Sequence, residues 1–387
     1  MHDVIIIGAG PAGLASARTL AERGRDVLVL EEHEAIGYPV HCTGVLGHEA
    51  FDELDLPCEV ILGYARSASF SAPDGQSVLV ESDRIVAAVI DRGRFDKLLA
   101  HRAEEAGARV ETGRPVRRVE VEGDGVAVWT RHDDRPRRAR ACVLACGANY
   151  RFNRELGLGV PRTFLQSAQV EVPFPEVPHV EVHFGRDIAP AGFAWTVPFR
   201  RDGRTHARLG LMCLQDARRR FEAFVADRAR RYGADLVDVP APRLKFLPLG
   251  PVSQTYAGRV LAVGDAAGLV KPTTGGGIYY GLLSGRLAGE TLDEALAQDT
   301  LAARHLRIYE TRWRERLGPE IRAGLAFRVV ASRVSDRGIN ALVELARVDG
   351  IVPLLKETAN FNWHRSAALA LLKHPAFRKI VLGSILS

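Results

Sequence analysis

The sequence contains little cysteine and no long hydrophobic run, and these two shortages exclude several classes of protein. The 5 cysteines are odd in number and no two of them have CxxC spacing, so we expect no disulfide framework, metal site or iron–sulfur cluster. No apolar stretch is long enough to cross a bilayer, and no signal-peptide pattern follows Met1. These absences predict a cytoplasmic protein.

A surplus of positive charge is missing from the first 300 residues and appears only near the end of the chain. Residues 301–387 contain 15 Lys and Arg against 7 Asp and Glu, whereas the whole chain has a net charge of +5. No nucleic-acid motif accompanies this basic region, so we expect no nucleic-acid partner. The surplus indicates either a solvated face or peripheral binding at the inner face of a membrane.

Glycine, in contrast, is plentiful, and one glycine-rich turn lies close to the N-terminus. A β-branched strand at 3–7 precedes the string Gly8-Ala-Gly10-Pro11-Ala12-Gly13, and a predicted helix follows. In such a GxGxxG turn the first glycine makes the bend, the second lets a pyrophosphate approach the backbone, and the third allows close helix–strand packing. Glu31 ends the next predicted strand, where it can bind a ribose hydroxyl. The unit predicts a dinucleotide-binding βαβ fold.

A second motif far downstream separates FAD from NAD. Gly264-Asp265 ends a predicted strand at 259–263, and an aspartate there can bond to the ribityl chain that only a flavin carries. The string Gly275-Gly276-Gly277 opens a predicted helix at 275–296, whose positive end can stabilise the anionic edge of a reduced flavin. We therefore expect one FAD. No second GxGxxG turn is present for a nicotinamide, so the electron donor stays open between NADPH, NADH and reduced ferredoxin.

The order of these motifs resembles the glutathione-reductase-type flavoproteins of the hydroxylase branch, and within them the geranylgeranyl reductase family. Besides the two glycine motifs, the resemblance rests on Asp91-Arg92-Gly-Arg-Phe95-Asp96, Pro39-Val-His41-Cys42-Thr-Gly44, Phe193-Ala-Trp195-Thr-Val-Pro198 and Lys271-Pro-Thr-Thr-Gly-Gly-Gly-Ile-Tyr279-Tyr280. It covers roughly residues 1–300. One departure is Gly210-Leu211-Met212, where the family has a second glycine in place of Met212.

The resemblance implies an α/β fold in which a Rossmann-type FAD-binding domain carries an inserted antiparallel β-sheet that binds the substrate. Alternating residues also predict this sheet between 160 and 213, and they predict a hairpin from 116–129 and 138–145 with a charged tip. The expected domains are a discontinuous FAD-binding domain at 1–65, 85–150 and 255–300, a substrate domain at 66–84 and 151–254, and a C-terminal helical region at 301–387.

The resemblance also assigns roles to single residues. Arg92 would contact the cofactor phosphates, although Asp91 and Arg92 are equally placed to cap the helix that follows. Phe193, Trp195, Pro198 and Tyr279 would line an apolar tunnel for a polyprenyl chain. The alternative is that the aromatic pair Phe193 and Trp195 belongs to the core.

The implied function is the reduction of prenyl (geranylgeranyl-type) double bonds in an isoprenoid lipid or its diphosphate. An isolated alkene accepts hydride poorly, so a reduced flavin must supply hydride while an acid protonates the other carbon. The alternatives are a monooxygenase of the same fold, a quinone-linked dehydrogenase and a prenyl-binding escort protein without a working flavin. The intact set of Gly10, Glu31 and Asp265 disfavours the escort protein.

Cys42 is the candidate acid, because the family resemblance places its loop beside the flavin ring. A thiol is mostly protonated at neutral pH and can therefore donate a proton. The alternatives are that His41 is the donor or that Cys42 is merely packed in the core. Neighbours in an extended segment point to opposite sides, so only one of His41 and Cys42 is expected to face the flavin.

Residues 361–386 mix apolar and basic side chains, which indicates either a membrane-surface helix or a helix packed on the protein.

Overall fold

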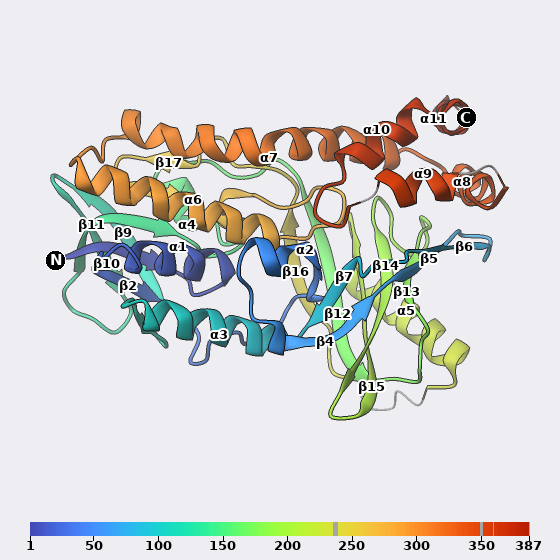
Figure 1. Cartoon of the computed structure of the whole chain (residues 1–387), viewed down its shortest axis with the longest axis horizontal. Helices are drawn as coiled ribbons and strands as arrows, with labels where there is room; N and C mark the ends of the chain where they lie inside the picture. The colour runs from blue at the N-terminus through green and yellow to red at the C-terminus, as the bar shows by residue number, and fades with distance from the viewer. Residues whose placement is uncertain (235–238, 349–350, 359, 387) are drawn as a thin grey trace. The chain divides into compact units, whose positions relative to one another are not determined.

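By its internal contacts the chain divides into two compact units. The computed structural model describes residues 1–234, 239–348, 351–358 and 360–386. The first unit comprises Met1–Val40, Arg92–Thr163 and Pro248–Ile321. The second unit comprises His41–Asp91, Phe164–Leu247 and Arg322–Ser387. Each unit has its own sheets and helices (Figure 1).

The first unit is built on a mainly parallel sheet with β1 (His2–Ile7) at its centre. The strand order is β17-β18-β11-β1-β2-β8. Strands β1, β2, β8, β11 and β18 run parallel. The buried apolar runs of β1, β2 and β18 fit burial on both faces of the sheet. The other strands are β2 (Val27–Leu30), β8 (Arg109–Glu111), β11 (Arg137–Leu144), β17 (Tyr256–Ala257) and β18 (Val260–Ala262). The predicted Rossmann-type fold is confirmed.

The predicted hairpin before β11 is more divided than we expected. Its first arm is itself a hairpin, β9 (Val116–Glu122) and β10 (Gly125–Thr130), because Gly123 has a positive φ of 50° and turns the chain. The charged tip is also shorter than predicted. Arg137 already lies in β11, where its guanidinium pairs with Glu111 at 2.8 Å.

Five helices accompany the sheet of the first unit, and two of them, α1 (Pro11–Ala21) and α6 (Ile278–Ala297), lie side by side (Figure 1). Pro11 occupies the start of α1, as its fixed φ favours. The others are α3 (Arg92–Glu105), α4 (Arg151–Glu155) and the start of α7 (Ala303–Ala331), with a short 3₁₀ helix η2 at Gly264–Ala267.

The second unit contains a seven-stranded sheet in the order β16-β12-β15-β14-β13-β5-β6. Its strands are β5 (Ser67–Ser71), β6 (Ser77–Glu81), β12 (Phe164–Pro173), β13 (Val180–His183), β14 (Phe193–Arg201), β15 (Arg204–Cys213) and β16 (Arg243–Pro248). The predicted second sheet is confirmed as separate and largely antiparallel, although β13 and β5 pair in parallel. Helix α5 (Ala217–Tyr232) covers one face, where Phe221 and Leu209 belong to one apolar core.

A three-stranded sheet completes the second unit in the order β3-β7-β4. It consists of β3 (Val45–Gly47), β7 (Ala87–Ile90) and β4 (Ile61–Ala65), with α2 (Glu49–Glu53) and the 3₁₀ helix η1 (Cys58–Val60) nearby in sequence. These strands pair with one another, and the division by contacts accordingly places residues 41–65 in the second unit. From the sequence, we expected these residues to belong to the FAD-binding domain. The predicted domain boundaries stay a prediction, because compact units need not coincide with domains.

The C-terminal region is helical, as expected, over the residues that the structure describes. After α7 it forms α8 (Asp336–Val348), α9 (Ile351–Thr358), α10 (Arg365–Lys373) and α11 (Pro375–Leu386). Val334, Ile351, Phe377 and Val381 form its buried core. Within the described ranges, we find no helix with the length and apolar character that a bilayer crossing requires.

Candidate functional site

The glycine turn between β1 and α1 uses its three glycines for different reasons. A Cβ on Gly8 would lie 2.4 Å from the carbonyl oxygen of Ala145, and one on Gly13 would lie 2.1 Å from the carbonyl oxygen of Gly8. Packing of the chain therefore requires both glycines. A Cβ on Gly10 would meet no described atom within 4 Å, and its φ of −79° suits any residue. Glycine at position 10 thus leaves open space at the N-terminus of α1, which suits an approaching pyrophosphate.

Glu31 is fixed against the same turn. It follows β2, and its Oε2 accepts a hydrogen bond of 2.8 Å from the backbone N–H of Ala9. Its Oε1 accepts one of 3.0 Å from the N–H of His33. The Glu31 side chain is 12% exposed, so a ligand lying along the turn can reach it. The structure thus brings Glu31 to the glycine turn, as the sequence predicted.

The downstream motif reaches the same place because α6 packs very closely on α1. A Cβ on Gly264 would lie 2.8 Å from the Cβ of Ala12, and one on Gly285 would lie 2.2 Å from the carbonyl oxygen of Ala12. Ser16 Oγ donates a 2.9 Å hydrogen bond to the Gly285 carbonyl. Ala12 of the first motif therefore packs directly against Gly264 and Gly285. The glycines Gly281, Gly285 and Gly289, spaced by four residues, were a signal for this contact that our sequence reasoning missed.

The three glycines before α6 form a loop and do not belong to the helix, contrary to our prediction. Gly275 has a φ of +69°, which an α-helix cannot contain, and α6 begins at Ile278. A 2.8 Å hydrogen bond from the N–H of Gly275 to the carbonyl oxygen of Lys271 closes the loop. A Cβ on Gly277 would lie 2.8 Å from Asp265 Oδ1. The aspartate of the second motif therefore lies beside the start of α6.

Two further residues hold the Asp265 turn, and sequence reasoning missed both. Tyr150 donates a 2.6 Å hydrogen bond to the carbonyl oxygen of Asp265, and burial raises the pKa of its hydroxyl, which keeps it a donor. Asn153, in α4, donates a 2.8 Å hydrogen bond to the carbonyl oxygen of Ala266.

Arg92, the predicted phosphate contact, forms an ion pair with Asp96 one turn along α3, with an N···O distance of 2.8 Å.

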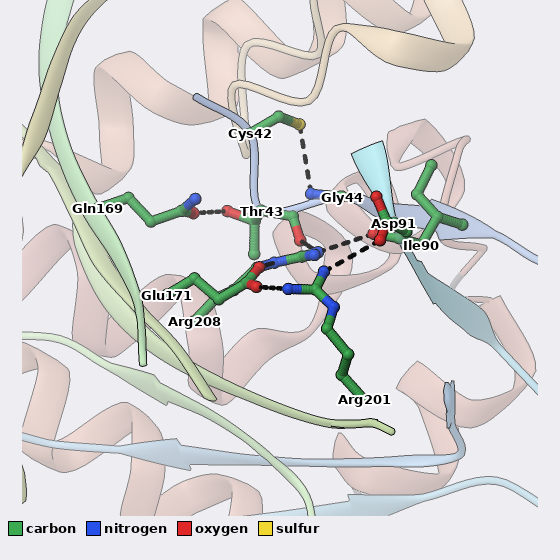
Figure 2. Close-up of polar contacts among 9 residues, drawn as sticks. All are labelled: Cys42, Thr43, Gly44, Ile90, Asp91, Gln169, Glu171, Arg201 and Arg208. Atoms are coloured by element: carbon green, nitrogen blue, oxygen red, sulfur yellow. Dashed lines mark hydrogen bonds and ion pairs between the residues drawn. The ribbon is translucent and has the colours of Figure 1, made fainter. Parts of the chain in front are cut away.

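In the second unit, the segment that carries Cys42 is tied to the sheet (Figure 2). Thr43 Oγ1 donates a 2.6 Å hydrogen bond to Oε1 of Gln169, and Arg208 donates one of 2.5 Å to the carbonyl oxygen of Thr43. The N–H of Gly44 lies 3.3 Å from Cys42 Sγ. Cys42 is half-buried, whereas His41 is exposed. Gln169 and Arg208 lie more than a hundred residues from this segment, and the sequence offered no signal for either contact.

An aromatic strip lies on the same sheet. The ring centroids of Phe193 and Trp195 are 5.8 Å apart, and those of Phe184 and Phe193 are 6.3 Å apart. Trp195 lies flat on its cross-strand partner Gly210, where a Cβ would come within 2.5 Å of the indole. The buried indole N–H finds no hydrogen-bond partner among the described residues. Met212 lies opposite Phe193 on the neighbouring strand. It occupies the position at which the resembled family has its second glycine after Gly210.

Of the other predicted substrate contacts, Pro198 lies on the opposite face of this sheet and Tyr279 belongs to the other unit. Pro198 pairs with Ala207, a member of the core under α5, so the two-residue period of β14 places it on the face opposite Phe193 and Trp195. Tyr279 belongs to α6 in the first unit and is only 1% exposed. Its ring lies 6.2 Å from that of Tyr280, centroid to centroid.

Comparison with known proteins agrees with this geometry. A family model described as FAD dependent oxidoreductase matches residues 3–60 and 85–320, which include the glycine turn, Glu31 and the Gly264-Asp265 motif. The open space at Gly10 and the adjacent carboxylate fit the pyrophosphate and ribose of that cofactor. The chain is therefore an FAD-dependent oxidoreductase.

Curated relatives define the family more narrowly. The chain is 35% identical to digeranylgeranylglycerophospholipid reductase 2 of Methanopyrus kandleri over 373 residues, covering 92% of each chain. It is 29% identical to digeranylgeranylglycerophospholipid reductase of Methanocaldococcus jannaschii over 91% of this chain and 92% of the relative. The chain belongs to the family of digeranylgeranylglycerophospholipid reductases.

Solved structures share the fold. A geranylgeranyl bacteriochlorophyll reductase-like protein from Thermoplasma acidophilum superimposes with a TM-score of 0.84 at 23% identity, covering 99% of this chain and 98% of the other. A halogenase solved with phloroglucinol and FAD gives a TM-score of 0.68 at 17% identity, covering 100% of this chain and 91% of the other. At these identities the likeness shows the fold alone.

Proposed function

We propose that this protein reduces the prenyl double bonds of an isoprenoid lipid of the digeranylgeranyl glycerophospholipid type. The observation that carries the proposal is identity of 35% over 92% of the chain to a reductase named for that lipid. When bound, reduced FAD supplies hydride to one alkene carbon and becomes oxidised FAD. An acid must protonate the other carbon in the same reaction, so that the double bond gains two hydrogen atoms in all.

The residues of the first unit would hold the cofactor. Gly10 and the N-terminus of α1 would face the pyrophosphate, and Glu31 would accept a hydrogen bond from the ribose. Asp265, beside the start of α6, would bind the ribityl chain, with Gly275, Gly276 and Gly277 providing the close backbone approach. Arg92 stays a predicted phosphate contact, although it is paired with Asp96.

Residues of the second unit would bind and protonate the lipid. Phe193 and Trp195, with Phe184 beside Phe193, provide aromatic surface for a prenyl chain. Cys42 would supply the proton, because its thiol is a transferable proton source and the Thr43 contacts hold its segment in place. His41 is the competing donor.

Peripheral membrane binding is part of the proposal, because the protein must reach a lipid substrate that lies in a membrane. One side of the C-terminal helix α11 buries Phe377 and Val381 in the second unit. This burial supports the alternative in which that side of the helix packs on the protein. Its other side exposes Leu382 and Ile385, next to the exposed basic residues Arg378 and Lys379. That side would contact an anionic bilayer.

The test is a product assay of purified protein reduced with dithionite. The protein is incubated with digeranylgeranyl glycerophospholipid vesicles with and without oxygen, and the lipid is analysed by mass spectrometry. We expect a gain of two hydrogen atoms per bond that needs no oxygen. A product that gains an oxygen atom, formed only in air, would instead show a monooxygenase.

A further inference from the structure

Arg208 is a buried charge in the middle of β15, and it donates both to backbone carbonyls and to a carboxylate. Its side chain is 1% exposed. Nη1 donates to the carbonyl oxygen of Thr43 at 2.5 Å and to that of Ile90 at 3.0 Å. Nε donates to Oε2 of Glu171 at 2.8 Å. A buried guanidinium is costly unless paired and hydrogen-bonded, so these contacts determine where Arg208 can lie.

A chain of charges extends from Arg208 across the sheet (Figure 2). Glu171 accepts from Arg208 through one carboxylate oxygen and from Arg201 through the other. Arg201 in turn lies 3.2 Å from Asp91 Oδ2. The ring of Phe199 lies 4.7 Å from the Arg208 guanidinium carbon and 5.4 Å from that of Arg201. Two arginines are thus balanced by two carboxylates, and Arg208 does not depend on the Cys42 segment for its charge compensation.

The strands that carry these groups also provide a second tether. Gln169 and Glu171 face the same side of β12, and their partners on β15 are Gly210 and Arg208. Gln169 binds the Thr43 hydroxyl, while Arg208 binds the Thr43 carbonyl. Thr43 is therefore held on both its side chain and its backbone by one rigid sheet. Burial lowers the pKa of Arg208, and the neighbouring Glu171 carboxylate acts in the opposite direction.

We propose that Arg208, supported by Glu171, is a positioning residue that fixes the Cys42 thiol by holding the backbone of Thr43 and Ile90. The inference rests on the proposed role of Cys42 as proton donor. Lysine cannot replace Arg208, because a single ammonium group lacks the planar fork that reaches Glu171 and two carbonyls together. Displacing a reacting group by about 1 Å can cost roughly 10²-fold in rate.

The test combines Arg208→Lys with Cys42→Ala in a double-mutant cycle. The measured quantity is the anaerobic single-turnover rate at which the lipid is reduced. We expect Arg208→Lys alone to slow this rate roughly 10²-fold, with FAD content and flavin spectrum unchanged. In the Cys42→Ala background the same substitution should have almost no further effect, since the thiol it positions is gone. An equal loss in both backgrounds would show that Arg208 does not act through Cys42.

A second readout does not depend on activity. Iodoacetamide labelling, followed by peptide mass spectrometry, measures the exposure of Cys42, with the exposed Cys58 as internal control. Arg208→Lys keeps the positive charge, so faster labelling of Cys42 with unchanged labelling of Cys58 reports release of the segment. Unchanged labelling of Cys42 would overturn the inference. If the wild-type protein reduces no prenyl lipid, the proposed function fails, but labelling still tests the tether.

Matched variants separate positioning from stability. Arg228→Lys removes a second buried guanidinium of the same unit, which lies on α5 and pairs with Glu181 at 3.5 Å. It should leave Cys42 labelling and the turnover rate unchanged. If Arg208→Lys fails to fold, Glu171→Gln removes the carboxylate charge that supports Arg208 and should show smaller changes in the same two measurements. No change in either measurement with Glu171→Gln would then refute the positioning role.

Discussion

The two units of this protein build their candidate sites from different materials. In the first unit the site is made mainly of backbone, in glycine turns and helix N-termini, and the side-chain carboxylates of Glu31 and Asp265 lie beside these turns. In the second unit it is made of side chains from distant strands, such as Arg208 on β15 and Gln169 on β12. Backbone sites are determined locally, because a few glycines dictate the turn. Side-chain networks depend on which strands pair, and a substitution can therefore affect one site without affecting the other.

The largest expected effect is the loss of cofactor on substitution of Gly10 by valine. Neither packing nor backbone conformation needs glycine at this position, so the variant should fold. Its side chain would occupy the space of the pyrophosphate, and the purified protein should be colourless. Circular dichroism checks the fold and flavin absorbance measures occupancy. A folded variant with a full complement of FAD would show that the cofactor lies elsewhere.

The opposite pattern is expected in the second unit. Cys42→Ala should keep its FAD and its yellow colour but lose reductase activity by roughly 10² to 10⁴-fold, as is typical when a general acid is removed. Rates with reduced protein and lipid measure the loss, and His41→Ala serves as the comparison. Normal turnover of Cys42→Ala combined with an inactive His41→Ala would reassign the acid to His41.

Much of the backbone site could be predicted from the sequence. The βαβ unit, Glu31 and the Gly264-Asp265 turn were found because each has its own local pattern. The start of α6 was misplaced, since a run of glycines does not reveal that Gly275 adopts a positive φ of 69°. The side-chain network could not be predicted, because the contact of Arg208 with Thr43 joins positions 165 residues apart. Its existence depends on the pairing of β12 with β15, which no local pattern specifies.

A third prediction concerns the stability of the second unit away from the proposed site. Burial would raise the pKa of Glu181, but hydrogen bonds from His183 and Tyr232 and the charge of Arg228 lower it to about 2. A carboxylate whose pKa is lowered in the folded state stabilises the protein above its unfolded pKa, and this contribution disappears as the pH falls from about 4.5 towards about 2. Glu181→Gln should therefore cost about 3 kcal/mol of unfolding free energy at pH 7.

Denaturant unfolding of both proteins at pH 7 and at pH 3 measures this cost. The difference between them should shrink at the lower pH, and FAD binding at pH 7 should be unchanged. A constant difference at both pH values would show that Glu181 does not titrate as described.

The smallest expected effect is at the C-terminal helix. Arg378 and Lys379 are exposed beside Leu382, which is 59% exposed. Each basic residue near an anionic surface contributes about 1 kcal/mol, so Lys379→Gln should weaken binding to phosphatidylserine vesicles roughly fivefold. Co-sedimentation measures it, with neutral vesicles as control. Equal binding by both proteins would exclude α11 as the membrane contact.

The most direct test of the central claim is the stoichiometry of a single turnover. Protein whose FAD has been fully reduced is mixed under nitrogen with digeranylgeranyl glycerophospholipid, and flavin absorbance is followed in a stopped-flow instrument while the lipid is analysed by mass spectrometry. The account predicts one flavin oxidised for each double bond lost. Flavin that stays reduced with the lipid until oxygen is admitted would contradict it.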